Sequence, residues 1–341
     1  HARYLAGVGH YPSVLALGEC HGAVPIHFRH KNGVPSLDGT GDMANLLDDP
    51  RMKYASCYDN PGAVGANPWF DVGNLYNGSA LVRPEQAHQP NYAYVPYLLT
   101  GDLYYLQECQ DAANYTLLIQ NPAYREFEKC LLVDNQTRGY AWGLNLIASA
   151  FIATKEAEKA GPLPAPLLPS TYWKRILDIN CAEFTRRWVN NGVNNPLTGC
   201  HFAVDIGLDH VAPWQQDMLG SVMGWMIYTG QFPEWRVNYE WHMRQAIDRA
   251  SGAAGYPRSR AIYYYYLSGG VTDMASLAAK NGLVATPDGN YPADADSAYC
   301  GYLRGNLRIA ALNGYADAAA CAPYADAQAR RKGYIPIKWA V

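Results

Sequence analysis

The sequence lacks any apolar run approaching the ~20 residues of a membrane-spanning helix, so a helical membrane protein is not expected. It also lacks a Ser-centred nucleophile elbow, a P-loop, an HExxH pair and the glycine pattern of a Rossmann fold. Those absences disfavour phosphate-loop and nicotinamide chemistry. The net charge is -3 with no long run of one sign, whereas a nucleic-acid surface should be basic. We therefore expect no cofactor, no nucleic-acid partner and no membrane partner.

Cysteine, by contrast, is plentiful, but no Cys-x-x-Cys pair occurs and a zinc ribbon is not expected. Neighbouring cysteines would close loops of roughly 20 to 40 residues, each worth ~3 kcal/mol in the loop-entropy model. The predicted disulfides are Cys20–Cys57, Cys109–Cys130, Cys181–Cys200 and Cys300–Cys321. Buried free thiols are the alternative. Disulfides, Asn-x-Ser/Thr sites and a first residue that is not Met together predict an extracellular, secreted or virion-associated protein, processed or cut from a longer chain.

Residues 23–38 predict a β-hairpin, because Asn32-Gly33 separates two short apolar runs. Alternation places His27 and Arg29 on one face and His30 on the other. A three-histidine metal site is therefore not expected, no metal is predicted, and the hairpin face is expected to be solvated. Residues 39–84 predict a long ordered loop with a short helix near 43–47. We thus expect an N-terminal region, 1–84, packed on a helical domain, 85–341.

The stretch from Glu85 to Tyr105 predicts two helices separated by a glycine turn. His88 and Tyr92 would share one helical face, and Pro96 inside the first helix predicts a kink. Gly101 would end that helix and Asp102 would cap the next. A polar and aromatic helix start fits both the wall of a binding cleft and a buried hydrogen-bonded network.

Helical periodicity continues to the end of the chain, interrupted by the Pro-rich connector 161–169. The expected helices cover 89–100, 102–119, 136–155, 168–191, 212–229, 232–250, 297–313 and 317–330, with further helical structure near 260–280. A similar turn recurs in YLLTG, MIYTG and AALNG, which indicates repeated helical hairpins. The predicted fold class is therefore mainly α, an (α/α) toroid of helical hairpins with the N-terminal β-hairpin and loop.

In such a toroid, alternate helices form an inner ring whose N-termini point toward one mouth. Polar and aromatic residues gather at those expected starts, and helix N-termini that converge favour an anion there. The residues at the starts are His88, Asn91, Tyr92, Gln136, Arg138, Trp142, Trp214, Gln215, Asp217, Asp294, Asp296 and Tyr299.

The segments AHQPNYAYVPYLLTGDLYYL, QTRGYAW and PWQQDMLG, with the hairpin VPIHFRHKNGVPSLD, carry a family resemblance. Over roughly residues 23–230 the chain resembles a largely uncharacterised family of bacterial and phage-encoded proteins with helical toroid domains. That resemblance implies no activity. More distantly, toroids of this kind are similar in fold to polysaccharide lyases and glycosidases, which is an analogy because fold does not determine function.

A polysaccharide lyase acting on a uronic-acid glycan is the first functional hypothesis. In it Tyr92 is the base or acid, His88 is its partner, and Arg138 binds the carboxylate with its planar guanidinium. The expected substrate-binding residues are Asn91, Trp142, Trp214, Gln215 and Tyr299.

A glycosidase is the second hypothesis, since it needs two carboxyl groups. Asp217 would be one, and the other is not selected among Asp205, Asp209, Asp294 and Asp296. The third hypothesis is a non-catalytic glycan-binding or self-assembling subunit of an extracellular filament or virion. Abundant Tyr and Trp, 27 and 9 residues, suit sugar contact and a large core equally.

Overall fold

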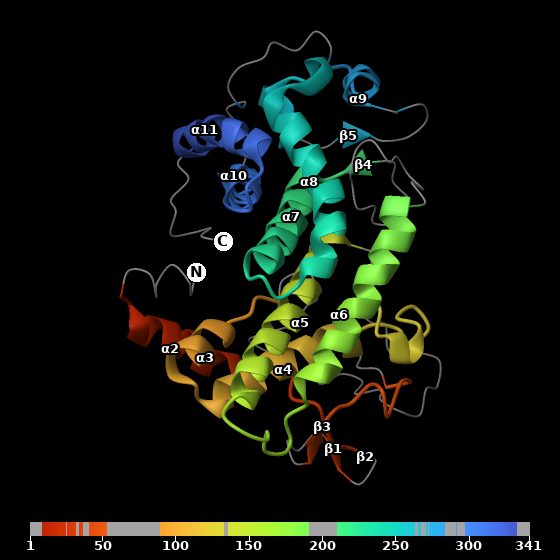
Figure 1. Cartoon of the computed structure of the whole chain (residues 1–341), viewed down its shortest axis with the longest axis vertical. Helices are drawn as coiled ribbons and strands as arrows, with labels where there is room; N and C mark the ends of the chain where they lie inside the picture. The colour runs from red at the N-terminus through yellow and green to blue at the C-terminus, as the bar shows by residue number, and fades with distance from the viewer. Residues whose placement is uncertain are drawn as a thin grey trace, which may run out of the picture. The chain divides into compact units, whose positions relative to one another are not determined.

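A computed structural model describes most of the helical part of the chain. The described residues are 9–24, 26–31, 34–36, 41–52, 89–132, 136–190, 210–262, 265–266, 271, 273–283, 291 and 297–332. Within them the protein is mainly helical (Figure 1). None of the described helices is both long and apolar enough to cross a bilayer.

Ten α-helices are described. They are α2 (Tyr11–His21), α3 (Tyr94–Thr100), α4 (Leu103–Leu118), α5 (Thr137–Glu158), α6 (Ser170–Phe184), α7 (Pro213–Tyr228), α8 (Arg236–Ser251), α9 (Met274–Lys280), α10 (Ser297–Leu312) and α11 (Ala316–Arg331). Short 3-10 turns are η2 (Phe127–Lys129), η5 (Pro233–Trp235), η6 (Ala253–Gly255) and η7 (Arg258–Arg260), and η3 (Thr185–Asn190) continues α6 as a π-helix.

The chain divides into two compact units. Unit 1 contains residues 134–141 and 181–341, and unit 2 contains residues 2–133 and 142–180. The division falls inside α5, whose first turn belongs to unit 1.

Two small antiparallel sheets accompany the helices. In unit 2, β1 (Arg29–Lys31) lies between β2 (Val34–Ser36) and β3 (Asp42–Met43). Lys31 pairs with Val34, so the β1–β2 pair falls within the segment predicted as a hairpin. The short helix expected near 43–47 is absent, because residues 42–43 form strand β3 instead. In unit 1, β4 (His210–Val211) pairs with β5 (Tyr265–Tyr266).

Helix α3 begins later than predicted. The Asn91 side chain accepts a hydrogen bond from the Tyr94 backbone N–H at 3.0 Å, which satisfies a donor of the first turn. Pro96 therefore lies near the helix start, where it removes no intrahelical donor and causes no kink, and Tyr92 precedes the helix. Gly101 ends α3 with φ 68°, and Asp102 caps α4, as predicted.

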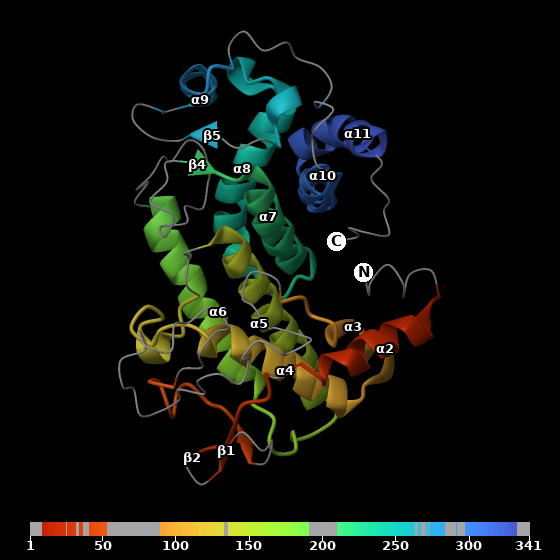
Figure 2. The ribbon, with the colours of Figure 1, turned by 180° about the vertical axis from the view of Figure 1, so that it is seen from behind.

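The recurring turn is confirmed as a helix end with a left-handed glycine. Gly101, Gly230 and Gly314 have φ values of 68°, 69° and 91°, a region that side chains with a Cβ rarely adopt. These turns join α3 to α4, connect α7 toward α8 through η5, and join α10 to α11. In unit 2, α2 packs on α3, and α3 packs on α4 (Figure 2).

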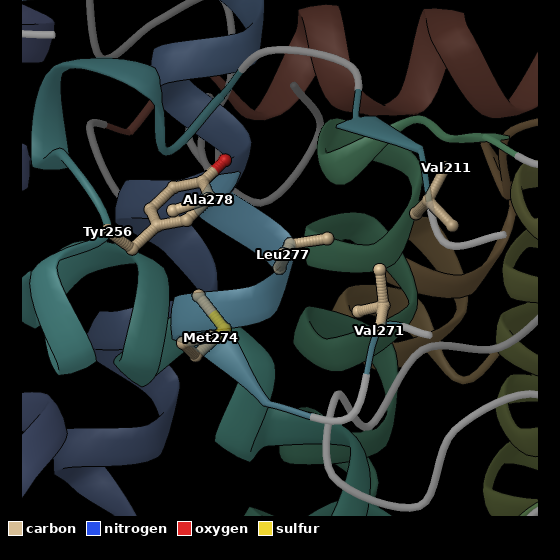
Figure 3. Packing of buried hydrophobic residues seen from close by; sticks show 6 residues of the cluster. All are labelled: Val211, Tyr256, Val271, Met274, Leu277 and Ala278. Carbon is tan, nitrogen blue, oxygen red and sulfur yellow. The ribbon is translucent and has the colours of Figure 1, made fainter. Parts of the chain in front are cut away.

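Close packing of α7 against α10 holds the middle of unit 1. A Cβ added to Gly220 would lie 2.5 Å from Asn306, and one added to Gly224 would lie 2.7 Å from Ile309. These glycines, four residues apart on one helical face, let the two helices approach. A smaller apolar cluster lies around α9, where Leu277 points toward Val211 and Val271 (Figure 3).

The disulfide prediction is wrong for the cysteines that the structure describes. Cys20, Cys109, Cys130 and Cys321 are free thiols, which excludes three of the predicted pairs. The Cys181 thiol donates to the carbonyl of Glu234 at 3.3 Å. Cys300 also forms no disulfide, while Cys57 and Cys200 lie outside the described residues. Apart from the exposed Cys20, the described cysteines are buried, where a free thiol packs as a small apolar group, so spacing along the chain did not reveal pairing.

Candidate functional site

The first turns of three helices meet in unit 1. Pro213 opens α7 at a position where a missing N–H has no cost. Two residues later, the Gln215 side-chain oxygen accepts a hydrogen bond at 3.0 Å from the backbone N–H of Arg138, in the first turn of α5. The start of α10 reaches the same place through Tyr299. We call Arg138, Trp214, Gln215 and Tyr299 the arginine–tryptophan cluster.

Trp214 is the centre of this cluster. Its ring stacks on Tyr299 with centroids 5.1 Å apart and planes within 1°, and Tyr302 lies 6.1 Å away. The Arg138 guanidinium carbon lies 5.2 Å from the Trp214 ring centroid, a cation–π distance. Because Trp214 is only 7% exposed, it supports Arg138 and Tyr299 and does not offer an open face of its own.

Arg138 is a cation without an acidic partner in the part of the chain that the structure describes. The side chain is half-buried, and its Nε is buried without a hydrogen bond. Partly desolvated guanidinium groups normally pair with carboxylates or phosphates, which match their planar fork. The cluster can therefore hold an anion of that shape.

Asp217, the predicted catalytic acid, is not part of this surface. It is fully buried, and its Oδ1 accepts hydrogen bonds from Arg249 at 2.7 Å and from Asn306 at 3.2 Å. Burial raises the pKa of Asp217, and the Arg249 guanidinium opposes that rise. A carboxylate enclosed in this way stabilises the packing of α7, α8 and α10 and has no access to a substrate.

The other predicted site residues lie elsewhere. Trp142 is half-buried on α5. Asn91 and Tyr92 belong to unit 2, where the Asn91 side chain accepts from the Tyr94 backbone N–H before α3 and burial raises the pKa of Tyr92. Outside the described residues lie His88, Asp205, Asp209, Asp294 and Asp296.

A second polar cluster, in unit 2, is one that sequence reasoning missed. On α4, Glu108 is 2% exposed. Its carboxylate lies 2.9 Å and 3.0 Å from His27 Nε2 and 3.3 Å from His21 Nδ1. Burial alone would raise the pKa of Glu108, but the imidazoles of His21 and His27 outweigh burial and lower it to about 2. We call His21, His27 and Glu108 the histidine–glutamate cluster.

An ion pair lies beside it. One helical turn along α4, Asp111 accepts hydrogen bonds from both terminal nitrogens of Arg29, one of them at 2.7 Å. Burial would lower the pKa of Arg29, but Asp111 outweighs burial and raises it. In the same way Glu108 and Asp111 overcome the burial of His27 and raise its pKa.

This arrangement corrects the expected solvated hairpin face. His27 and Arg29 do lie on one face, two residues apart, and they meet Glu108 and Asp111, three residues apart on α4. Arg29 is 3% exposed and the His27 side chain is 24% exposed, so the face is covered by α4 rather than solvated. The signal was available: a predicted apolar helix with two acids on one face needs cationic partners, since buried charges are paired.

Acid should destabilise the protein through Glu108. A carboxyl whose pKa is lower in the folded than in the unfolded chain stabilises the fold above the unfolded value, and the contribution is lost as pH falls. Between pH 4.5 and about 2, we expect the free energy of unfolding to fall by up to about 1.4 kcal/mol per pH unit from this group. Urea unfolding in chelator-treated buffer measures how steeply the free energy of unfolding changes with pH. This pH dependence should be shallower in Glu108→Gln than in wild type. An equal pH dependence would contradict the role given to Glu108.

Comparisons of the chain with models of protein families, with curated proteins and with solved structures find no match.

Proposed function

We propose that this protein is an extracellular carbohydrate-active protein that binds an acidic, uronic-acid glycan and cleaves it as a polysaccharide lyase. One observation carries the proposal: the half-buried Arg138 is held against Trp214, with no acidic partner among the described residues. A guanidinium in this state is suited to a sugar carboxylate, which it can bind through two parallel hydrogen bonds.

In a lyase, binding of the sugar carboxylate also assists catalysis. β-Elimination removes the proton at C5, beside the carboxylate, while the glycosidic oxygen leaves from C4 with a proton from an acid. Charge that develops on the carboxylate in the transition state is stabilised by a fixed cation. Arg138 supplies that cation in our proposal, and the half-buried Tyr299 borders the sugar.

The proton-transferring group is a tyrosine in this proposal. Tyr299 is the phenol that lies in the same unit as Arg138, stacked on the tryptophan that supports it. Tyr92, the base or acid predicted from sequence, belongs to unit 2, and its predicted partner His88 lies outside the described residues, so neither is assigned to this site. Hydrolysis is less favoured because it needs two accessible carboxyl groups, and Asp217 is enclosed. The toroid of helical hairpins belongs to the same proposal, supported by three hairpins with left-handed glycine turns.

Removing Arg138 tests the proposal directly. Arg138→Ala should weaken binding to the best ligand in a panel of uronate polysaccharides at least about tenfold, the size expected when a charge-assisted hydrogen-bonding partner is removed. Arg138→Lys should keep part of the affinity, since a lysine offers charge without the fork. Calorimetry measures both, and ultraviolet absorbance of unsaturated products, read beside reducing ends, separates elimination from hydrolysis.

Two controls distinguish binding at Arg138 from nonspecific attraction between charges. Arg187 also lies 5.2 Å from a tryptophan ring, that of Trp188, in the same unit, so Arg187→Ala should bind normally. Methyl-esterified polymer should bind equally to wild type and Arg138→Ala. The proposal fails if Arg138→Ala binds as wild type does, or if no uronate polymer binds at all. Binding without unsaturated products would leave the non-catalytic subunit as the function.

A further inference from the structure

A third aromatic ring extends the arginine–tryptophan cluster along α10. Tyr302 lies three residues after Tyr299, so both side chains share one face of that helix. Its ring centroid is 6.1 Å from that of Trp214, with the planes inclined by 30°. Both tyrosines are half-buried, whereas Trp214 is 7% exposed. The tyrosines, and not the tryptophan, are therefore the rings of this cluster that a ligand can contact.

The two tyrosines pack differently against Trp214. Tyr299 lies parallel to it, with centroids 5.1 Å apart and planes within 1°, so the indole covers one face of that phenol. The greater distance and tilt of Tyr302 leave more of its ring uncovered by the indole. Because a helix rises about 1.5 Å per residue, Tyr302 lies about 4.5 Å further along α10 than Tyr299. The two rings thus form a short row beside the tryptophan that supports Arg138.

We propose that Tyr302 binds the sugar next to the uronate that Arg138 binds, a subsite that rests on the proposed uronate binding. Pyranose rings carry C–H groups that pack on an aromatic face, while the phenol hydroxyl can exchange hydrogen bonds with sugar hydroxyls. Arg138 and Tyr302 contact the same indole, from 5.2 Å and 6.1 Å. A glycan with one carboxylate at the guanidinium therefore has its neighbouring sugar within reach of Tyr302.

The helix starts around the cluster agree with an anionic chain as the ligand. Helices α5, α7 and α10 carry no acidic residue in their first turns, although the helix dipole favours acids there. An anionic polymer beside these turns is attracted by the partial positive charge at each helix start. The subsite therefore favours an oligosaccharide over a free uronate, which would occupy Arg138 alone.

Ligands of different length test the subsite in the whole protein. Polygalacturonate, alginate and hyaluronan are screened first, and the uronate monosaccharide and tetrasaccharide of the polymer that binds best are then titrated. Tyr302→Leu should weaken tetrasaccharide binding about tenfold, the size expected when an aromatic contact is lost, and leave monosaccharide binding within about twofold of wild type. Tyr302→Phe keeps the ring and should retain most of the tetrasaccharide affinity. Tyr228→Leu, at the exposed end of α7, is the control and should bind both ligands as wild type does.

Fluorine NMR of protein labelled with 3-fluorotyrosine reports on the ring directly. The Tyr302 signal, identified by its loss in Tyr302→Phe, should shift with the tetrasaccharide and not with the monosaccharide. Equal weakening of both ligands by Tyr302→Leu, or unchanged tetrasaccharide affinity, would overturn the subsite while the proposed uronate binding stands. If none of the three polymers binds, the proposed function fails and the subsite fails with it. If Tyr302→Leu does not fold, the fluorine signal of the wild-type sequence still decides.

Discussion

Replacing Asp217 with alanine should lower the free energy of unfolding by about 3–5 kcal/mol, the usual cost of breaking a buried ion pair from one side. Asp217 and Arg249 are both completely buried, with 2.7 Å between their bonded atoms. In Asp217→Ala the guanidinium stays in the interior without the carboxylate that it bonds, while Gln245 and the Ala261 carbonyl remain as neutral partners. Urea unfolding followed by circular dichroism measures the loss.

A double variant separates the lost charge from the lost volume. Adding Arg249→Met to Asp217→Ala removes the stranded cation and should regain part of the stability, since apolar replacement of a buried pair is often neutral. Recovery should be incomplete because Gln245 and Ala261 lose their donor. A double variant less stable than Asp217→Ala would contradict this account. The exposed pair Lys174–Asp178 provides the control, and Asp178→Ala should cost less than about 1 kcal/mol.

Helices were predictable where periodicity and local stop signals agreed. Helices α4, α7, α10 and α11 begin and end within a few residues of expectation, because a cap, a proline or a glycine marks their ends in the sequence. Helix α3 was placed too early because nothing local shows that the helix begins only at Tyr94, whose backbone N–H donates to the Asn91 side chain.

Pairings over long sequence distances were not predictable. The grouping of Arg138, Trp214, Gln215 and Tyr299 followed from an argument about helix starts, and each lies in or beside a first turn. By contrast, the sequence around Asp217 does not indicate which of the chain's arginines forms its ion pair, and so did not identify Arg249. The same is true of His27 and Glu108, 81 residues apart. Periodicity shows which face a residue occupies, but only packing shows what it faces.

Arg125 should be the other position of large effect, because one buried side chain satisfies four carbonyls. It is 0% exposed. It donates to Leu117 at 3.0 Å, Gln120 at 3.1 Å and Pro50 at 2.9 Å, and also to Met52. Burial lowers its pKa to about 10, so the group stays charged at neutral pH. It ties the segment 41–52 to the end of α4.

Arg125→Met should therefore cost about 3–5 kcal/mol, since each buried carbonyl left without a partner costs about 1–3 kcal/mol before relaxation. Arg125→Lys should cost less, because an ammonium keeps the charge but reaches fewer of the carbonyls. Exposed Arg51 provides the control, and Arg51→Met should stay within about 0.5 kcal/mol of wild type.

Hydrogen exchange adds a local measure of the same variant. If Arg125 holds the segment in place, amides of residues 41–52 in Arg125→Met should lose protection before those of α5 or α6, by local opening. Met52, whose N–H bonds to the Asp49 carbonyl at 3.1 Å, should be among the first. Uniform loss across unit 2 would mean that Arg125 supports the whole unit, and unchanged protection with unchanged stability would remove its role altogether.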